Sequence, residues 1–355
     1  ILTGFKNFKK IKNIIKVYKP KFFVIFNDKT YLKVKKSLKQ NKVKILNSKD
    51  FYAYKFKKSD VSILAIPGIA GLKPSLSIIK RSKKILIANK ESIICGWEFI
   101  NKSLSKYKTN FIPIDSEHFS IWTLLKNEKI DNVKKIYLTA SGGPFLNKKN
   151  SSISNIKPKY ALKHPNWKMG KKISIDSATL MNKIFEVIEA KKIFKLDINK
   201  FKIIIHPKSY IHAIVHYNNG LVKFLAHDTD MTIPIINSLY INGKKFIYNE
   251  GNLKFETLNE INFIKPNNKK FPVINILKKI KNKPSYFETI LIVINDFLVY
   301  KYLKGEISYL SLNTNLTKLI KNPYFKRYYK LRPKNIIDIK IVVKKVTTYL
   351  NKIKI

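Results

Sequence analysis

At 355 residues the chain is long enough for two or three domains, each with its own hydrophobic core. Its 45% of hydrophobic and 12% of aromatic residues exclude a disordered protein. The net charge is +49, from 71 Lys and Arg against 22 Asp and Glu, and a charge of this size taken alone suggests a polyanion as partner.

The basic residues are almost all lysines, and they are spread along the whole chain. Arginine, the side chain best suited to bidentate binding of guanine and phosphate, occurs only at Arg81, Arg327 and Arg332. This pattern favours a solvated, lysine-rich surface that reflects the coding bias of an AT-rich genome, so we expect no nucleic acid partner. Salt-sensitive binding of a polyanion is the alternative.

The cysteine count and the length of the apolar runs indicate in which cell compartment the protein is expected. Cys95 is the single cysteine, which excludes a disulfide framework and fits a reducing cytoplasm. No apolar run reaches the roughly 18–20 residues that span a bilayer, so we expect no membrane partner. The basic N-terminal stretch lacks a signal-peptide core and an initiator Met, and we interpret it as the interior of a clipped domain.

Residues 1–112 alternate between helical and strand periodicity, which predicts βα units and a parallel sheet. Predicted helices cover 6–18 and 31–38, and predicted strands cover 22–26, 61–66 and 84–88. The loop at 67–71 and the run Asn89-Lys90-Glu91-Ser92 each follow a strand, at the edge where open parallel sheets bind ligands.

Residues 113–240 mix the two periodicities and predict an α+β domain. Strands are expected at 111–114, 135–139, 203–205, 211–217 and 221–225, with a hairpin turn at Asn219-Gly220, and helices at 119–125 and 178–194. A linker is expected at 241–266 and a small helical domain at 267–355. The fold class is therefore α/β with an additional helical domain.

Carboxylates in the middle third indicate chemistry. Asp115 and Glu117 lie two positions apart in the sequence and follow a predicted strand, so both side chains can face one cleft. Capping of the next helix by Asp115 is an equal alternative. Asn182, Lys183, Glu186 and Glu189 share one helix face, although a surface stripe explains that spacing as well. Asp115, Glu117 and Glu186 without Cys or His at zinc spacing would suit Mg²⁺ or Mn²⁺.

Three shorter signals have two interpretations each. Ser141-Gly142-Gly143 is either an anion-binding nest or a simple turn. Ser177 is expected at a helix N-terminus, as a cap alone or as a cap that shares the helix dipole with a phosphate. The segment 164–170 is either a lid that excludes water or a loop fixed by Trp167.

Taken together, five runs carry a family resemblance: ANKES at 88–92, PIDSEH at 113–118, LTASGGPF at 138–145, and the long runs at 164–190 and 206–235. With these the chain resembles the 1-deoxy-D-xylulose 5-phosphate reductoisomerases. The resemblance implies a homodimer with a Rossmann-like nucleotide domain, a catalytic domain and a C-terminal helical domain. It also implies rearrangement of 1-deoxy-D-xylulose 5-phosphate and its reduction with NADPH to 2-C-methyl-D-erythritol 4-phosphate.

Carried over by position, the resemblance assigns roles to residues of this chain. The metal ligands are Asp115, Glu117 and Glu186. Substrate contacts are Lys90, Ser116, Glu117, Ser141, His164, Ser177, Asn182, Lys183 and Glu186. Cofactor contacts are Phe5, Lys6, Asn7, Asn89, Glu91 and Gly170, and Trp167 belongs to the lid. The expected catalytic residues are Lys90, Glu117, His164, Lys183, Glu186 and Glu189.

The sequence departs from the family pattern at two places. The family opens with a strand and a glycine-rich loop of the form GSTGSIG, which nothing here matches, so we expect a nucleotide domain without its first βα unit, as in a fragment. Ile184 stands where the family usually has Gly, and we expect local repacking. An inactive relative and, from the charge alone, a nucleic-acid-binding protein are the alternative hypotheses.

Overall fold

The structure is a computed structural model that describes residues 1–38, 42–240 and 258–354. It contains two compact units, Ile1–Lys58 and Ser59–Ile355. Most of the predicted linker, residues 241–257, lies outside the described residues. Among the helices of the described ranges, none is long and apolar enough to cross a membrane.

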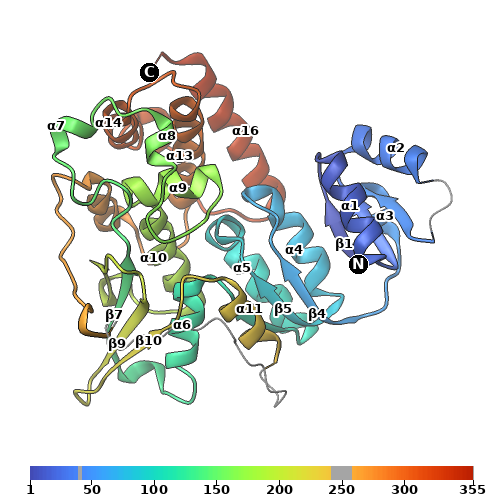
Figure 1. The fold of residues 1–355 in the computed structure, drawn as a ribbon, viewed down its shortest axis with the longest axis horizontal. Helices are drawn as coiled ribbons and strands as arrows, with labels where there is room; N and C mark the ends of the chain where they lie inside the picture. The colour runs from blue at the N-terminus through green and yellow to red at the C-terminus, as the bar shows by residue number, and fades with distance from the viewer. Residues whose placement is uncertain (39–41, 241–257, 355) are drawn as a thin grey trace. The chain divides into compact units, whose positions relative to one another are not determined.

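The first unit is a three-stranded parallel sheet with its connecting helices (Figure 1). Its elements are β1 (Leu2–Gly4), α1 (Phe8–Tyr18), β2 (Phe22–Ile25), α2 (Asp28–Ser37), β3 (Lys44–Asn47) and α3 (Ser48–Ala53), and its strand order is β1-β2-β3. Ile11 and Ile15 of α1 are buried against Phe23 and Ile25 of β2. An asparagine caps each helix, as Asn7 does by accepting the backbone N–H of Lys10 at 3.0 Å.

The second unit begins with another three-stranded parallel sheet, of order β4-β5-β6. Its elements are β4 (Ser59–Leu64), α4 (Leu72–Ile79), β5 (Ser82–Ile87), α5 (Lys90–Tyr107) and β6 (Asn110–Pro113), with α6 (Ser116–Leu124) after the last strand. The apolar strands are buried, with Ile85, Leu86 and Ile87 fully inaccessible to solvent. Both α5 and α6 begin directly beyond a strand, which places their first turns at one edge of the sheet.

A four-stranded mixed sheet follows, of order β10-β9-β7-β8. Its strands are β7 (Val133–Ala140), β8 (Phe201–Ile205), β9 (Ile211–Tyr217) and β10 (Val222–Ala226). β7 and β8 are parallel, whereas β9 pairs antiparallel with both β7 and β10. The predicted hairpin turn is present, with Gly220 at φ +88° and its N–H donating to the carbonyl of Tyr217.

The helix predicted at 178–194 is two helices, α9 (Lys171–Thr179) and α10 (Met181–Phe194). They meet at Leu180, which has left-handed backbone angles of φ 68° and ψ 8°. The prediction that Ser177 lies at the start of a helix is therefore wrong, because this residue lies in the last turn of α9. Leu180 itself is buried, so packing of its side chain stabilises this break.

The remaining elements are mainly helical and complete the predicted α/β fold class with its helical C-terminal region. They are α7 (Asn150–Ile153), α8 (Pro158–Ala161), α11 (Thr232–Leu239), α13 (Phe287–Leu303), α14 (Tyr309–Leu319), α15 (Pro323–Lys326) and α16 (Ile336–Lys352). α13 is buried on nearly all sides and packs against α5, α9, α14 and α16 (Figure 1).

Candidate functional site

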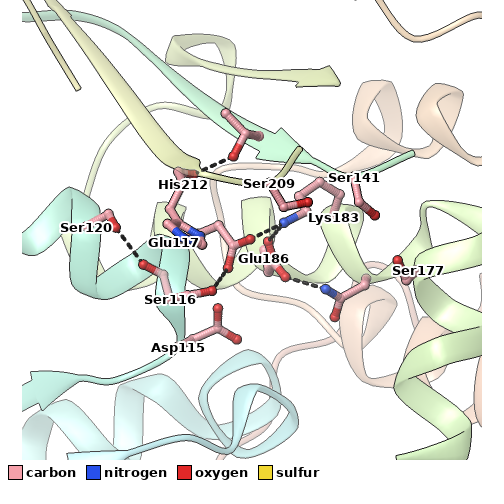
Figure 2. A network of polar contacts seen from close by, with 12 residues as sticks. Asp115, Ser116, Glu117, Ser120, Ser141, Ser177, Lys183, Glu186, Ser209 and His212 are labelled. Carbon is pink, nitrogen blue, oxygen red and sulfur yellow. Dashed lines mark hydrogen bonds and ion pairs between the residues drawn. The ribbon is translucent and has the colours of Figure 1, made fainter. Parts of the chain in front are cut away.

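A cavity of about 150 Å³ in the second unit collects the predicted chemistry. Residues of α5, α6 and α10 and of the loops after β7 and β8 line it, as do residues of the 164–170 segment. Figure 2 shows part of this wall, with Glu117, Lys183 and Glu186 among the labelled side chains. Its wall includes all nine residues expected to contact substrate, namely Lys90, Ser116, Glu117, Ser141, His164, Ser177, Asn182, Lys183 and Glu186, and also Asp115.

Asp115 and Glu117 enter the cavity because the chain turns from β6 into α6 at this point. Asp115 occupies the N-cap position of α6, but its side chain makes no capping hydrogen bond and instead contacts Lys90 Nζ at 2.9 Å. Glu117 accepts a hydrogen bond of 2.6 Å from the hydroxyl of Ser116 (Figure 2). Asp115 thus stands at the N-cap position, as one alternative predicted, but its carboxylate lines the cavity and does not cap the helix.

Helix α10 brings in the third carboxylate together with its neighbours. Lys183 Nζ lies 2.6 Å from Glu117 Oε1 and 2.6 Å from Glu186 Oε2 (Figure 2). Lys183 is 6% and Glu186 1% exposed, so the interpretation of this helix face as a surface stripe is wrong. The opposite face is also buried, with Ile184 fully inaccessible, so the helix is enclosed on all sides.

Lys90, in the first turn of α5, joins the carboxylates from the other side. Its Nζ contacts Asp115 Oδ2 at 2.9 Å, Glu186 Oε1 at 3.2 Å and Asn182 Oδ1 at 2.8 Å. Burial alone would lower the pKa of Lys90, but Asp115 and Glu186 more than reverse this and hold it well above its ordinary value. Two ammonium groups thus face three carboxylates, which leaves one negative charge uncompensated when all five are ionised.

The carboxylates themselves titrate differently. Burial raises the pKa of Asp115, but Lys90 outweighs it and holds that pKa well below its ordinary value. Burial and the neighbouring Glu186 raise the pKa of Glu117 to about 7. Close carboxylates with an excess negative charge are the arrangement that a bound cation stabilises.

Three carboxylate oxygens from Asp115, Glu117 and Glu186 lie within 4.8 Å of one another. An all-oxygen set of this size fits a hard divalent cation such as Mg²⁺ or Mn²⁺ and leaves coordination positions for other oxygens. Because Glu117 and Glu186 belong to α6 and α10 and Asp115 directly precedes α6, the three side chains are held on rigid elements of the fold.

Glu189 is not in the cavity wall, although it was expected among the catalytic residues. Its Oε2 lies 3.6 Å from Nδ1 of His118, whose ring is fully buried behind Asp115 and Glu186. His118 Nδ1 is also 3.6 Å from Asp115 Oδ1, and its Nε2 donates to the backbone carbonyl of Glu186 at 2.9 Å. Burial lowers the pKa of His118, but Glu189 and Asp115 raise it to about 9, so its charge is balanced by these carboxylates.

The other side of the cavity offers neutral hydrogen-bond donors. His164 Nε2 lies 2.9 Å from Ser141 Oγ and 3.1 Å from Ser177 Oγ. Nδ1 of the same ring accepts the backbone N–H groups of Asn166 and Trp167, so the proton of the neutral ring is on Nε2. Burial and the ammonium of Lys183 lower the pKa of His164 to about 4, which keeps this ring neutral.

The Ser141-Gly142-Gly143 loop requires its glycines. Gly142 and Gly143 have φ angles of +79° and +69°, and a Cβ on Gly143 would lie 2.9 Å from the Cα of Ala178. The loop therefore packs closely on the end of α9, where Ser177 lies. This close approach brings Ser141 and Ser177 to the same imidazole.

Segment 164–170 is held over the cavity by specific contacts. Asn166 Nδ2 donates to the carbonyl of Pro207 at 2.6 Å and to Ser209 Oγ at 2.8 Å. The Trp167 ring lies edge-on to His212, with 6.0 Å between ring centroids. Sequence reasoning assigned no role to Ser209 or His212, which also line the cavity, although both lie within the run 206–235.

The residues expected to contact the cofactor fall in both units. Phe5, Lys6 and Asn7 form the turn between β1 and α1 in the first unit. In the second unit Asn89 caps α5 and its amide donates to the carbonyls of Ile66 and Gly68, which fixes the loop at 67–71. Glu91 forms an ion pair with Lys172, and Gly170 has no neighbour where a Cβ would stand.

Fold and site together define a class of protein, an α/β fold with a cavity lined by carboxylates and lysines between a parallel sheet and a buried helix. Family models described as 1-deoxy-D-xylulose 5-phosphate reductoisomerase, its C-terminal domain, and the DXP reductoisomerase C-terminal domain match residues 1–96, 111–194 and 227–346, respectively. The chain belongs to the 1-deoxy-D-xylulose 5-phosphate reductoisomerase family.

Relatives of known name support this assignment over the full length. The reductoisomerase of Pelagibacter ubique is 51% identical over 96% of this chain and 88% of that protein. The one from Clostridium botulinum strain Loch Maree is 34% identical over 99% of this chain and 91% of that protein. The solved Zymomonas mobilis enzyme in complex with NADPH has a TM-score of 0.86 at 28% identity, covering 99% of this chain and 92% of that one.

A second solved structure aligns with this chain over a similar length. It is a DOX-P reductoisomerase in complex with NADPH, fosmidomycin and magnesium, with a TM-score of 0.89 at 27% identity. The similarity covers 98% of this chain and 90% of that one.

Proposed function

We propose that the chain catalyses the NADPH-dependent rearrangement and reduction of 1-deoxy-D-xylulose 5-phosphate to 2-C-methyl-D-erythritol 4-phosphate. The observation that carries this proposal is the convergence of Asp115, Glu117 and Glu186 with Lys90 and Lys183 on one cavity. The carboxylates, lysines and neutral donors match the needs of a polyhydroxylated, phosphorylated substrate, and the family assignment supplies the reaction.

Asp115, Glu117 and Glu186 would hold the metal ion, which we propose to be Mg²⁺ or Mn²⁺. When bound, the cation withdraws negative charge from substrate oxygens and NADPH supplies the hydride for the reduction. The ammonium groups of Lys90 and Lys183 pair with these carboxylates and would also bind substrate oxygens.

The neutral half of the cavity would bind the phosphate. Ser141, Ser177 and His164 present hydroxyl and imidazole donors around one point, and the proton on Nε2 of His164 makes the ring a donor. Lys183 adds a positive charge nearby, since it is one of the groups that lowers the pKa of His164. Anchoring the phosphate orients the reacting carbons, and the 164–170 segment excludes water.

Loss of NADPH absorbance tests the function directly. Purified chain, 1-deoxy-D-xylulose 5-phosphate and Mg²⁺ or Mn²⁺ should consume NADPH, and chelation of the metal should stop the reaction. Omitting the sugar phosphate is the matched blank. A folded chain that consumes no NADPH with either metal would contradict the proposal.

We also propose a homodimer that forms through the outer face of the mixed sheet. Phe224 is 54% and Val222 56% exposed on edge strand β10, and both point to the same face. Across the sheet Phe224 pairs with Ile214, which is 9% exposed and pairs with the half-buried Tyr137, so the apolar row runs over three strands and is exposed mainly on β10. A second copy of this chain would cover that row. The buried single thiol of Cys95 supports a cytoplasmic location.

Light scattering during size-exclusion chromatography tests the dimer. Phe224→Asp should produce monomers because it places a charge on the apolar row. Leu310→Asp on α14, at a residue that is also 54% exposed, is the matched control and should leave the dimer intact. A wild-type chain that elutes as a monomer would contradict the dimer and leave the catalytic proposal unaffected.

A further inference from the structure

Lys172 is the centre of a second charged cluster, outside the cavity wall. Its Nζ lies 3.2 Å from Glu91 Oε1, 2.9 Å from Asp176 Oδ2 and 3.1 Å from Asp296 Oδ1. The three carboxylates belong to α5, α9 and α13, so one ammonium group joins three helices that are distant in sequence. No function was predicted from the sequence for Lys172 or Asp296, and Asp176 was not predicted to be an ion-pair partner.

The cluster is held rigidly on its buried side. The side chain of Asp176 is 3% exposed, and its second oxygen accepts a hydrogen bond of 2.7 Å from the amide of Asn295, which is fully buried. The Lys172 ammonium also lies 5.4 Å from the centroid of the Phe185 ring on α10. Asn295 and Asp296 are neighbours on α13, so this helix fixes both Asp176 and Lys172.

The charge balance makes the cluster dependent on Lys172. Three carboxylates face one ammonium group, which leaves a net charge of −2 when all four are ionised. Burial raises the pKa of Glu91, but Lys172 outweighs it, so the pKa of Glu91 lies below its ordinary value. Burial also raises the pKa of Asp296, to about 7, despite the same ammonium. Without Lys172 the carboxylates would repel one another and Glu91 would lose its ion-pair partner.

The first turn of α5 lies between this cluster and the cavity. Lys90 contacts the metal-binding carboxylates, and the next residue, Glu91, contacts Lys172. Lys90 has three polar partners of its own, Asp115, Asn182 and Glu186. Loss of Lys172 would therefore displace Glu91 much more than Lys90.

We propose that Lys172 is a positioning residue for the dinucleotide cofactor, which fixes Glu91 against α9 and α13 in the orientation that binds the cofactor. This inference rests on the proposed function and on the NADPH contact that the family resemblance implies for Glu91. It extends the cofactor site to α13. Asn295 and Asp296 of this helix do not line the cavity, and the Lys172 cluster links them to Glu91. Lys172 thus acts on cofactor affinity and leaves the metal site unchanged.

Three variants separate this role from a general effect on folding. Lys172→Met removes the charge and keeps the aliphatic stem, and Lys172→Arg keeps the charge. Lys301→Met is the matched control, because Lys301 lies in the last turn of α13 and forms an exposed ion pair of 2.9 Å with Glu306. Each variant is examined by NADPH fluorescence titration, by Mn²⁺ titration with electron paramagnetic resonance, and by hydrogen exchange of the peptide 88–96.

For Lys172→Met we expect NADPH affinity to fall about tenfold or more, the effect of losing one charge-assisted hydrogen bond. Amide exchange in the peptide 88–96 should accelerate, Mn²⁺ affinity should not change, and Lys172→Arg should restore most of the NADPH affinity. Lys301→Met should match the wild type in every measurement.

Unchanged exchange of peptide 88–96 in Lys172→Met would overturn the positioning role. An equal loss of Mn²⁺ and NADPH affinity would overturn it too, since that result indicates a general structural defect. If the wild-type chain bound no NADPH, the proposed function would fail, and the exchange of peptide 88–96 would still decide whether Lys172 positions Glu91.

Discussion

Two lysine–carboxylate pairs in this molecule have almost the same geometry and opposite surroundings. Lys183 and Glu117 lie 2.6 Å apart with side chains 7% and 12% exposed, whereas Lys83 and Asp60 lie 2.8 Å apart with side chains 66% and 86% exposed. In the first pair, burial strengthens every electrostatic interaction and raises the cost of an unpaired charge. In the second, water and salt screen the charges.

The difference shows why the total charge of the chain says little about its function. Lysine accounts for 68 of the 71 basic residues, since only three are arginine, and most of these lysines are in solvent like Lys83. The chemistry depends on a few lysines enclosed with carboxylates, such as Lys90 and Lys183. The predictions below remove one member of a cluster at a time to test this contrast.

The largest effect is expected from Glu186→Gln, which removes a charge shared by the proposed metal ion and both lysines. We expect turnover to fall by roughly 10³-fold, about 4 kcal/mol of transition-state stabilisation. Mn²⁺ affinity should fall as well, while the circular dichroism spectrum should be retained. Glu306→Gln on the surface is the control and should keep full activity. Near-normal turnover of Glu186→Gln would show that Glu186 is not a metal ligand.

Lys183→Met should lower stability in addition to substrate binding, because it leaves Glu117 and Glu186 without their shared ammonium group. Breaking a buried ion pair by removing one partner costs about 3–5 kcal/mol. A divalent cation at the same carboxylates should recover part of this loss. Thermal unfolding in EDTA and in excess Mg²⁺ measures it, and the metal-induced rise in Tm should be larger for the variant than for the wild type. Equal rises in both proteins would argue against a shared carboxylate site.

Sequence patterns predicted those features of the fold and of the cavity that depend on residues close together in the sequence. The periodicity of 84–88 and 111–114 predicted β5 and β6, and the spacing of Asn182, Lys183 and Glu186 predicted a common helix face. Burial of that face could not be predicted, because an exposed Lys–Glu stripe has the same spacing. The family resemblance, and no pattern by itself, selected among these alternatives.

The remaining errors concern interactions between distant segments. Leucine rarely adopts left-handed backbone angles, so no local pattern predicted the break at Leu180. Because of this break, Ser177 lies at the end of a helix and not at its start. The hydroxyl of Tyr309 donates to the carbonyl of Ala178 at 2.7 Å, which helps to end α9 there. The Lys172 cluster was missed for the same reason, since its carboxylates at 91, 176 and 296 share no local pattern.

A moderate effect is expected from pH through His164, whose pKa is about 4 in the folded protein because of burial and Lys183. The unfolded chain binds a proton below about pH 6.5. Stability contributed by the neutral ring is therefore complete above that pH and is lost as the pH falls from 6.5 towards 4. Urea unfolding at pH 7.5 and pH 5 should show a smaller loss for His164→Gln than for the wild type. Identical losses would mean that the pKa of His164 is not lowered in the folded protein.

The smallest effect is expected from Lys83→Ala, which removes the exposed pair with Asp60. Proximity to Asp60 raises the pKa of Lys83, but neither side chain is enclosed, so solvent screens the attraction. We expect turnover, Mn²⁺ affinity and Tm to equal those of the wild type within error, at low and at high salt. Because the two pairs have nearly the same length, a large fall in Tm for Lys83→Ala would show that distance, and not burial, sets the strength of ion pairs in this protein.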